Sequence, residues 1–116
     1  MRIALINSGL GLLAPAAVLH RMRPDADLVL LVKPQFEAGR ARIGKGGIVR
    51  DPAVHLAVLA EVVAGLAAEG LVVVDVMPSP LRGADGNVEF LVRVAHRGVA
   101  VDDDVLAAAV AETSAP

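Results

Sequence analysis

Short apolar runs of strand length alternate along the chain with segments of helical spacing and with polar turns. Three such runs are Asp27–Val32 (DLVLLV), Leu71–Met77 (LVVVDVM) and Val88–Val94 (VEFLVRV). The first two are nearly continuous in apolar residues, which is typical of strands buried on both faces of a sheet. The pattern therefore predicts three strands of a buried sheet.

Helical spacing marks three further segments. Leu10–Met22 places apolar residues three or four positions apart. A second helix should begin at Asp51-Pro52, because Asp is a favoured cap and Pro a favoured first residue, and should run to about Glu69 before Gly70 ends it. The alanine-rich segment from Val101 to Glu112 predicts a short third helix. Residues 34–50 show neither the helical period nor the strand period of apolar residues. They are expected to form a long polar loop, which in a compact domain is usually functional or mobile.

The connections between the predicted strands fix their directions. A helix joins the first two strands, so they should run parallel with a right-handed crossover. A turn rich in Pro and Gly joins the last two, so they should be antiparallel. Lys33 follows the first strand, and Glu89 stands near the start of the last one. Both residues should therefore lie on one edge of the sheet, the edge where α/β proteins bind ligands.

Composition narrows the class of protein. The 116 residues are enough for one domain, and they are 55% hydrophobic with a mean hydropathy of +0.61. The chain has no cysteine, which excludes disulfides, thiolate catalysis and cysteine metal sites. A secretion signal at the start is disfavoured because polar residues and glycines interrupt the first apolar run. No uninterrupted apolar run reaches the ~18 residues that span a bilayer, so we expect a cytoplasmic protein.

Charge is unevenly distributed, although the net charge is only -2. The segment between residues 33 and 50 is basic, whereas the tail from Val101 onward has four acids and no base. Within the basic segment, Gly39 to Gly46 nearly spells a phosphate-binding P-loop, but Gly46 stands where that motif needs Ser or Thr. Two interpretations stay open: a flexible loop that contacts an RNA backbone, or a solvated surface loop. The RNA contacts would be Arg40, Arg42, Lys45 and Arg50.

Other candidate chemistry is weaker. Taken alone, Lys33 is a strand-end lysine that reaches into water, and Glu89 is an exposed residue beside a turn. Their predicted meeting at one edge favours a functional pair. His20, His55 and His96 have no metal-ligand spacing and are expected to be surface or packing residues, so no metal site is predicted.

Three stretches together resemble a known family. "LVKPQFE", "GKGGIVRDP" and "SPLRGADGNVEFL" are similar to the TlyA family of rRNA 2′-O-methyltransferases, some of which are named hemolysins. The resemblance covers about residues 10 to 95. It implies a Rossmann-like, FtsJ-like domain that uses S-adenosylmethionine and acts on rRNA or a ribosomal subunit. The family's catalytic set is Lys-Asp-Lys-Glu, and the resemblance carries its second Lys to Lys33 and its Glu to Glu89. Lys33 would orient the ribose hydroxyl and assist its deprotonation, and Glu89 would position the lysine.

The chain also departs from the family pattern. The family's first catalytic Lys, its N-terminal RNA-binding domain and its glycine-rich cofactor loop would all lie upstream of Met1. Its catalytic Asp should fall near Ala4 to Ile6, where this chain has no acid. The resemblance therefore implies the C-terminal half of a methyltransferase sheet, with parallel strands, a final antiparallel strand and flanking helices. Residues 1–97 would be the partial domain, and residues 98–116 an acidic tail or short helix.

Such a half domain would be inactive alone and would lack the main cofactor loop, so its cofactor-binding residues stay unknown. Its central strand would be an open apolar edge, available to a missing N-terminal half or to a second copy. The alternative is a non-catalytic RNA-binding or assembly module that uses the basic loop 38–50. A pore-forming toxin is disfavoured, because the sequence has neither a membrane span nor an amphipathic basic helix.

Overall fold

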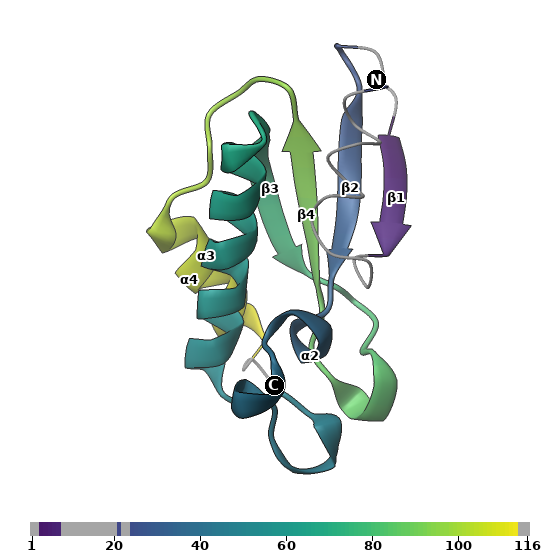
Figure 1. Cartoon of the computed structure of the whole chain (residues 1–116), viewed down its shortest axis with the longest axis vertical. Helices are drawn as coiled ribbons and strands as arrows, with labels where there is room; N and C mark the ends of the chain where they lie inside the picture. The colour runs from purple at the N-terminus through teal and green to yellow at the C-terminus, as the bar shows by residue number, and fades with distance from the viewer. Residues whose placement is uncertain (1–2, 8–20, 22–23, 114–116) are drawn as a thin grey trace.

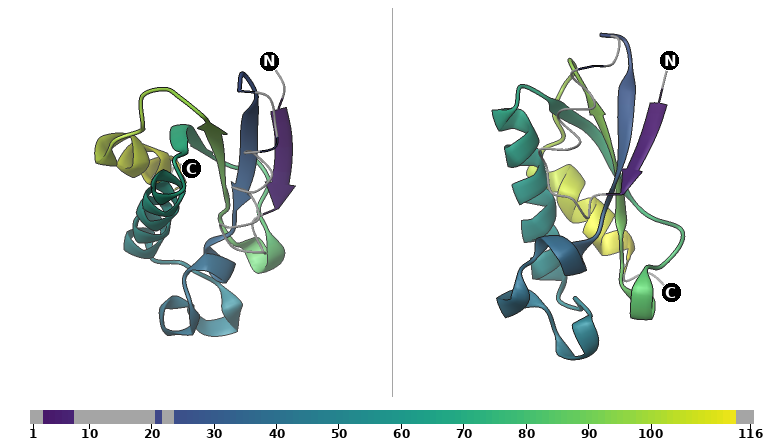
Figure 2. Two further views of the ribbon diagram at one scale, coloured as in Figure 1. Left: turned by 45° about the horizontal axis from the view of Figure 1, so that its top comes forward. Right: turned by 45° about the vertical axis from the view of Figure 1, so that its right-hand side comes forward.

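A computed structural model of the chain describes residues 3–7, 21 and 24–113, and shows a four-stranded sheet with helices packed on one face. Its strands are β1 (Ile3–Asn7), β2 (Asp27–Val32), β3 (Val72–Pro78) and β4 (Phe90–Ala95). Its helices are α2 (Pro34–Glu37), α3 (Pro52–Ala68) and α4 (Asp103–Glu112), and three single 3₁₀ turns are η2 (Arg40–Arg42), η3 (Lys45–Gly47) and η4 (Ala84–Gly86). Both α3 and α4 lie on the same side of the sheet (Figure 1 and Figure 2). Among the described residues, none of these helices is long and apolar enough to span a membrane.

The strand order is β1-β2-β4-β3. β4 is antiparallel to β3, as predicted, and it is also antiparallel to β2. β2 and β3 therefore run in the same direction but do not pair, because β4 lies between them. Because β4 lies between two strands, both of its edges are hydrogen-bonded. Its residues Phe90, Val92 and Val94 are buried and at most 1% exposed. The mixed α/β architecture with a final antiparallel strand agrees with the predicted fold class.

β1 corrects the predicted order, which had no strand before residue 10. It pairs in parallel with β2, from Ile3 opposite Asp27 to Asn7 opposite Leu31. The edge of β2 that was expected to be open is therefore covered. The segment Ala4 to Ile6, where the family's acid was expected, forms the middle of β1. The predicted helix Leu10–Met22 and His20 lie outside the described residues.

The core lies between the sheet and the two long helices. α3 begins as predicted, since Asp51 caps it by accepting a hydrogen bond from the backbone of Ala53 at 2.9 Å. Its buried side chains include Val58, Leu59, Val62 and Leu66, which belong to one hydrophobic core with buried residues of β2, β3 and β4. α4 confirms the predicted short helix. Its buried Leu106, Ala109 and Val110 belong to the same core, so the C-terminal segment packs on the sheet domain up to Thr113.

The segment of residues 34–50 is more ordered than the long polar loop predicted from sequence. It contains α2 and the turns η2 and η3, and Ala38 and Val49 are buried in the core. Gly46 and Gly47 both take positive φ, of 78° and 77°, so the tight turn at η3 uses conformations that favour glycine. Periodicity missed α2 because it has only four residues, of which Pro34 and Gln35 alone are buried.

Candidate active site

Lys33 and Glu89 flank the last pair of residues in the β2–β4 ladder. Val32 at the end of β2 pairs with Phe90 at the start of β4, so Lys33 and Glu89 take the next position of the same antiparallel register. The segments that carry them lie at one end of the sheet, beside α2 and the turn between β3 and β4 (Figure 1 and Figure 2). The structure thus brings the two residues to one edge, although their side chains form no direct ion pair.

Glu89 is a buried acid, and its side chain is held on two sides. It is 5% exposed, and its Oε2 accepts a hydrogen bond of 2.8 Å from Nε2 of Gln35. On another side it lies against the backbone of Gly83, where an added Cβ atom would collide with Oε2. Burial removes water from the Glu89 carboxylate, and one hydrogen bond from a neutral amide replaces only part of that hydration. A cation or a further donor beside the carboxylate would therefore be favourable.

Gln35 is the site residue that sequence reasoning missed. Its side chain lies under the surface, and its amide group faces Glu89 because a carboxylate can only accept a hydrogen bond. Its other polar atom, Oε1, is buried and has no hydrogen-bond partner among the residues that the structure describes. This leaves a free acceptor next to the Glu89 carboxylate. The sequence offers little signal for it, since a single Gln in a polar segment is expected to be exposed.

Lys33 is half-buried and caps the start of α2. Its backbone carbonyl accepts hydrogen bonds from the backbones of Phe36 and Glu37, at 2.9 and 3.2 Å. Its ammonium Nζ lies over the ring of Phe36, 5.4 Å from the ring centroid. A lysine held by this cation–π contact keeps its three N–H donors available for a bound hydroxyl or phosphate oxygen.

Asn87 ties the β3–β4 turn to the basic segment. It is 2% exposed; its Oδ1 accepts a 3.0 Å hydrogen bond from the backbone of Val49, and its Nδ2 donates to the carbonyl of Gly47 at 3.2 Å. Sequence reasoning assigned Asn87 to the turn alone. The structure shows that it also fixes the basic segment beside Glu89.

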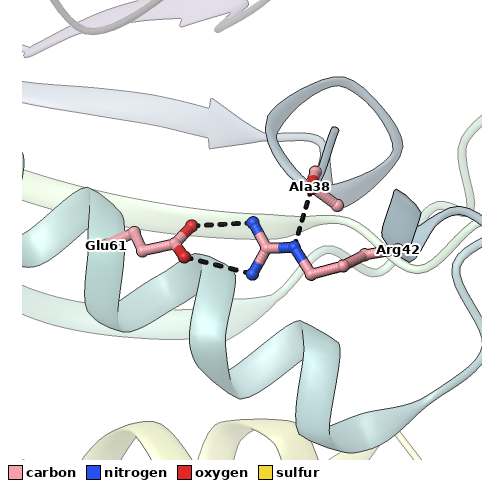
Figure 3. Close-up of polar contacts among 3 residues, drawn as sticks. All are labelled: Ala38, Arg42 and Glu61. Atoms are coloured by element: carbon pink, nitrogen blue, oxygen red, sulfur yellow. Dashed lines mark hydrogen bonds and ion pairs between the residues drawn. The ribbon is translucent and has the colours of Figure 1, made fainter. Parts of the chain in front are cut away.

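The predicted RNA contacts differ in how many hydrogen bonds their side chains already make within the protein. Arg42 makes two hydrogen bonds to Glu61 of α3, at 3.1 and 3.0 Å, and its Nε donates to the carbonyl of Ala38 at 2.7 Å (Figure 3). The hydrogen bond with Glu61 raises the pKa of Arg42 above its ordinary value. Arg42 therefore braces the segment against α3 with three of its N–H groups. Lys45 and Arg50 are exposed, and Arg50 donates to the carbonyl of Lys45 at 3.0 Å. The side chain of Arg40 lies outside the described part of the structure.

A polar cavity of about 350 Å³ lies where the basic segment meets the β3–β4 turn. Arg50, Arg82 and Asp85 line it, and His55 forms part of its wall. His55 is a packing residue, one of the two roles expected for it. Its Nε2 lies 2.9 Å from the carbonyl oxygen of Val49, and its ring packs edge-on against Phe90 with 5.8 Å between centroids.

Substituting Gly83 tests whether its backbone sets the position of Glu89. The φ of Gly83 is not in the positive range that only glycine favours, so the main effect of Gly83→Ala should be the collision with Glu89. We expect a lower melting temperature and a broken Gln35–Glu89 hydrogen bond, because the collision displaces a buried carboxylate from its donor. Gln35 is the only glutamine in the chain, so its side-chain amide gives one assignable pair of ¹H–¹⁵N NMR signals. These signals should move toward the position seen in Glu89→Ala.

A double substitution provides the control. Glu89→Asp shortens the acid and makes room, so Gly83→Ala should move the Gln35 signals much less in that background. Unchanged Gln35 signals in Gly83→Ala would contradict the close packing of Gly83 on the carboxylate.

Comparison with known proteins points to one family. A family model described as FtsJ-like methyltransferase matches residues 13–96. YqxC from Bacillus subtilis, named for rRNA methyl transfer, is 52% identical over 71 residues, which are 61% of this chain and 25% of that protein. The 16S/23S rRNA (cytidine-2′-O)-methyltransferase TlyA of Mycobacterium tuberculosis is 39% identical over 93 residues, covering 77% of this chain and 35% of that protein.

A solved structure of a hemolysin-named protein from Streptococcus thermophilus superimposes with a TM-score of 0.83. It is 34% identical in sequence, and the match covers 94% of this chain and 40% of that one. The chain thus spans between a quarter and two fifths of the length of these relatives.

Proposed function

Because the chain belongs to the FtsJ-like methyltransferase family, we propose that it is the C-terminal part of an enzyme that methylates ribose 2′-hydroxyls in rRNA. One observation carries this proposal: Lys33 and Glu89 occupy adjacent places at one edge of the sheet, and Glu89 is buried and oriented by Gln35. An rRNA substrate implies a cytoplasmic location. The names of YqxC and TlyA support the same substrate class.

In this proposal, Lys33 acts on the ribose. The new C–O bond would form as the methyl–sulfur bond of the donor breaks, and the hydroxyl proton would pass to water. Nζ of Lys33 would hydrogen-bond the 2′-oxygen and stabilise the negative charge that develops on it. Lys33 can reach a bound hydroxyl because none of the carboxylates in the described part of the chain pairs with its ammonium. Its contact with Phe36 limits the positions that Nζ samples before the ribose arrives.

Glu89 and Gln35 complete the site. Glu89 attracts the Lys33 ammonium and orients it toward the ribose, while Gln35 is a positioning residue that fixes the carboxylate. S-adenosylmethionine, the methyl donor that the family generally uses, would supply the methyl group as a sulfonium cation. The Glu89 carboxylate and Oε1 of Gln35 are buried and electron-rich, which would favour the positive charge of a sulfonium bound at the nearby surface. We assign no described residue to the rest of the cofactor.

The basic segment would hold the RNA backbone. Lys45 and Arg50 are the contacts that the structure leaves most exposed, and Arg82 lines the same cavity as Arg50. Arg40 stays a proposed contact, and Arg42 would contribute its charge while its guanidinium braces the segment against α3. Phosphate contacts of this kind position the nucleic acid without reading its sequence.

A second function is favoured by one feature, the absence of a direct Lys33–Glu89 ion pair. A non-catalytic module that binds RNA or assists assembly would need the exposed Lys45 and Arg50 but not the acid. The two functions differ in their need for cofactor and in their product.

Reconstitution separates them. The chain is mixed with the separately produced N-terminal part of YqxC, and the transfer of a radiolabelled methyl group from S-adenosylmethionine to deproteinised rRNA and to ribosomal subunits is measured. We expect labelled ribose only when both parts are present. Each part alone, and the mixture without cofactor label, are the controls. RNA binding by the chain with no cofactor binding or methyl transfer in any mixture would favour the module instead.

A further inference from the structure

Phe36 presents an aromatic ring to solvent at the edge that carries Lys33 and Glu89. The chain has two phenylalanines and neither tryptophan nor tyrosine. Phe90 is fully buried, whereas Phe36 is 63% exposed. An exposed phenyl ring forgoes the stabilisation that burial of its apolar surface would bring. What distinguishes it from other exposed apolar residues, such as Val99, is its place beside Lys33 at the edge of the proposed site.

The local backbone keeps the ring outside the core. α2 is a single turn of helix that starts right after Lys33, and it buries Pro34 and Gln35. Because Gln35 must point inward to reach Glu89, the next residue of the turn points outward. The ring of Phe36 is thus held at the surface by the same short helix that orients the Glu89 carboxylate.

One face of the ring already has a cation. Nζ of Lys33 lies 5.4 Å from the ring centroid, a distance typical of a cation–π contact. This contact fixes the ring relative to the ammonium that, in the proposed function, binds the ribose hydroxyl. The exposed remainder of the ring is then a flat surface beside that ammonium.

The flat ring of Phe36 and the positive charge of Lys33 together indicate the class of ligand. Aromatic side chains next to basic groups are the usual platform for unstacked nucleobases in single-stranded RNA. An apolar protein surface would be a poor occupant, since an ammonium lies against the ring.

We propose that Phe36 is a stacking platform for a nucleobase of the RNA strand that passes the Lys33–Glu89 edge. This inference rests on the proposed function and deepens it, because it assigns a base contact where the basic segment supplies only phosphate contacts. Phe36 is then a binding residue for RNA.

The chain is well suited to a direct test. Phe36→Trp places the only tryptophan of the chain at this position, so its emission reports that site alone. Single-stranded RNA is titrated in, and a base stacked on the indole should quench the emission strongly. The matched control is Val99→Trp. Val99 is 88% exposed and follows the end of β4, whereas Glu89 precedes its start, so the two sites lie at opposite ends of that strand. The emission of a tryptophan at position 99 should therefore not change.

Affinity gives a second readout through the anisotropy of a labelled RNA. Phe36→Leu should weaken binding by about 5- to 150-fold, which corresponds to the loss of one stacked base. Phe36→Tyr should bind within about twofold of the parent chain, because it keeps a stacking ring. The melting temperatures of both variants should match that of the parent, since Phe36 lies outside the core.

The outcomes separate this inference from the proposed function. If RNA binds but Phe36→Trp emission and Phe36→Leu affinity are unchanged, stacking is wrong while the methyltransferase proposal stands. If Phe36→Trp emission shifts with protein concentration in the absence of RNA, the ring serves self-association and the inference is overturned. If neither the chain nor its mixture with the YqxC part binds RNA, both proposals fail.

Discussion

Replacing Lys33 with methionine is expected to lower the rate of methyl transfer in the reconstituted enzyme by about 10²- to 10⁴-fold. Methionine is unbranched and of similar length, but it removes the ammonium that would stabilise charge on the 2′-oxygen. Glu89→Gln should give a loss in the same range, because it removes the charge that orients Lys33 while keeping a group of the same size near Gln35. The rate is measured in single turnovers with saturating RNA and S-adenosylmethionine, so that binding does not limit it.

Lys45→Met is the matched control for Lys33→Met. It makes the same chemical change at an exposed lysine of η3, on the proposed RNA-binding segment. It should weaken RNA binding and leave the single-turnover rate at saturation almost unchanged. A Lys33→Met enzyme that keeps its rate within about threefold would remove Lys33 from the chemistry and, with it, the basis of the proposed mechanism.

The shared edge of Lys33 and Glu89 could be predicted from sequence because it depends only on strand direction. A strand that ends at Val32 and an antiparallel strand that starts near residue 90 have their flanking residues at the same end of the sheet. The pairing of β2 with β4, which strand direction does not predict, makes these residues neighbours. The start of α3 could also be predicted from sequence, since Asp51 and Pro52 favour a helix start through interactions within its first turn. Signals of this kind are local and keep their meaning in any tertiary context.

The features that sequence reasoning missed are contacts between distant segments. Gln35 reaches Glu89 across 54 positions, and Asn87 reaches Gly47 across 40 positions. Neither spacing leaves a periodic trace, and both residue types are common in exposed turns. The same holds for Arg42, whose bonds to Glu61 make it a brace between the basic segment and α3.

Strand order was also beyond local reasoning. β4 could have paired with β3 alone, as the turn between them predicted, but its second edge pairs with β2. This choice is decided by burial: Phe90, Val92 and Val94 fill the centre of the core only if β4 is an inner strand. β1 was missed because the glycines and polar residues that follow it interrupt the apolar pattern.

Phe90→Ala should be the most destabilising substitution in the core, with a loss of about 3–5 kcal/mol in the free energy of unfolding. Phe90 is fully buried between the sheet and α3, and its ring packs against His55. A domain of this size has a total stability of about 5–15 kcal/mol, so this loss removes a large part of it. Urea titration followed by circular dichroism measures the change, since the parent chain has no tryptophan or tyrosine to report it.

The other phenylalanine supplies the control, because Phe36→Ala makes the same deletion at a ring that is 63% exposed. Its free energy of unfolding should stay within about 0.5 kcal/mol of the parent value. The pair therefore separates the two uses of an aromatic ring in this chain: Phe90 holds the start of β4, and so the residue before it, Glu89, against the sheet, whereas Phe36 serves the ligand side. Equal losses for the two variants would mean that Phe36 is part of the core, and that its ring is not free to stack on RNA.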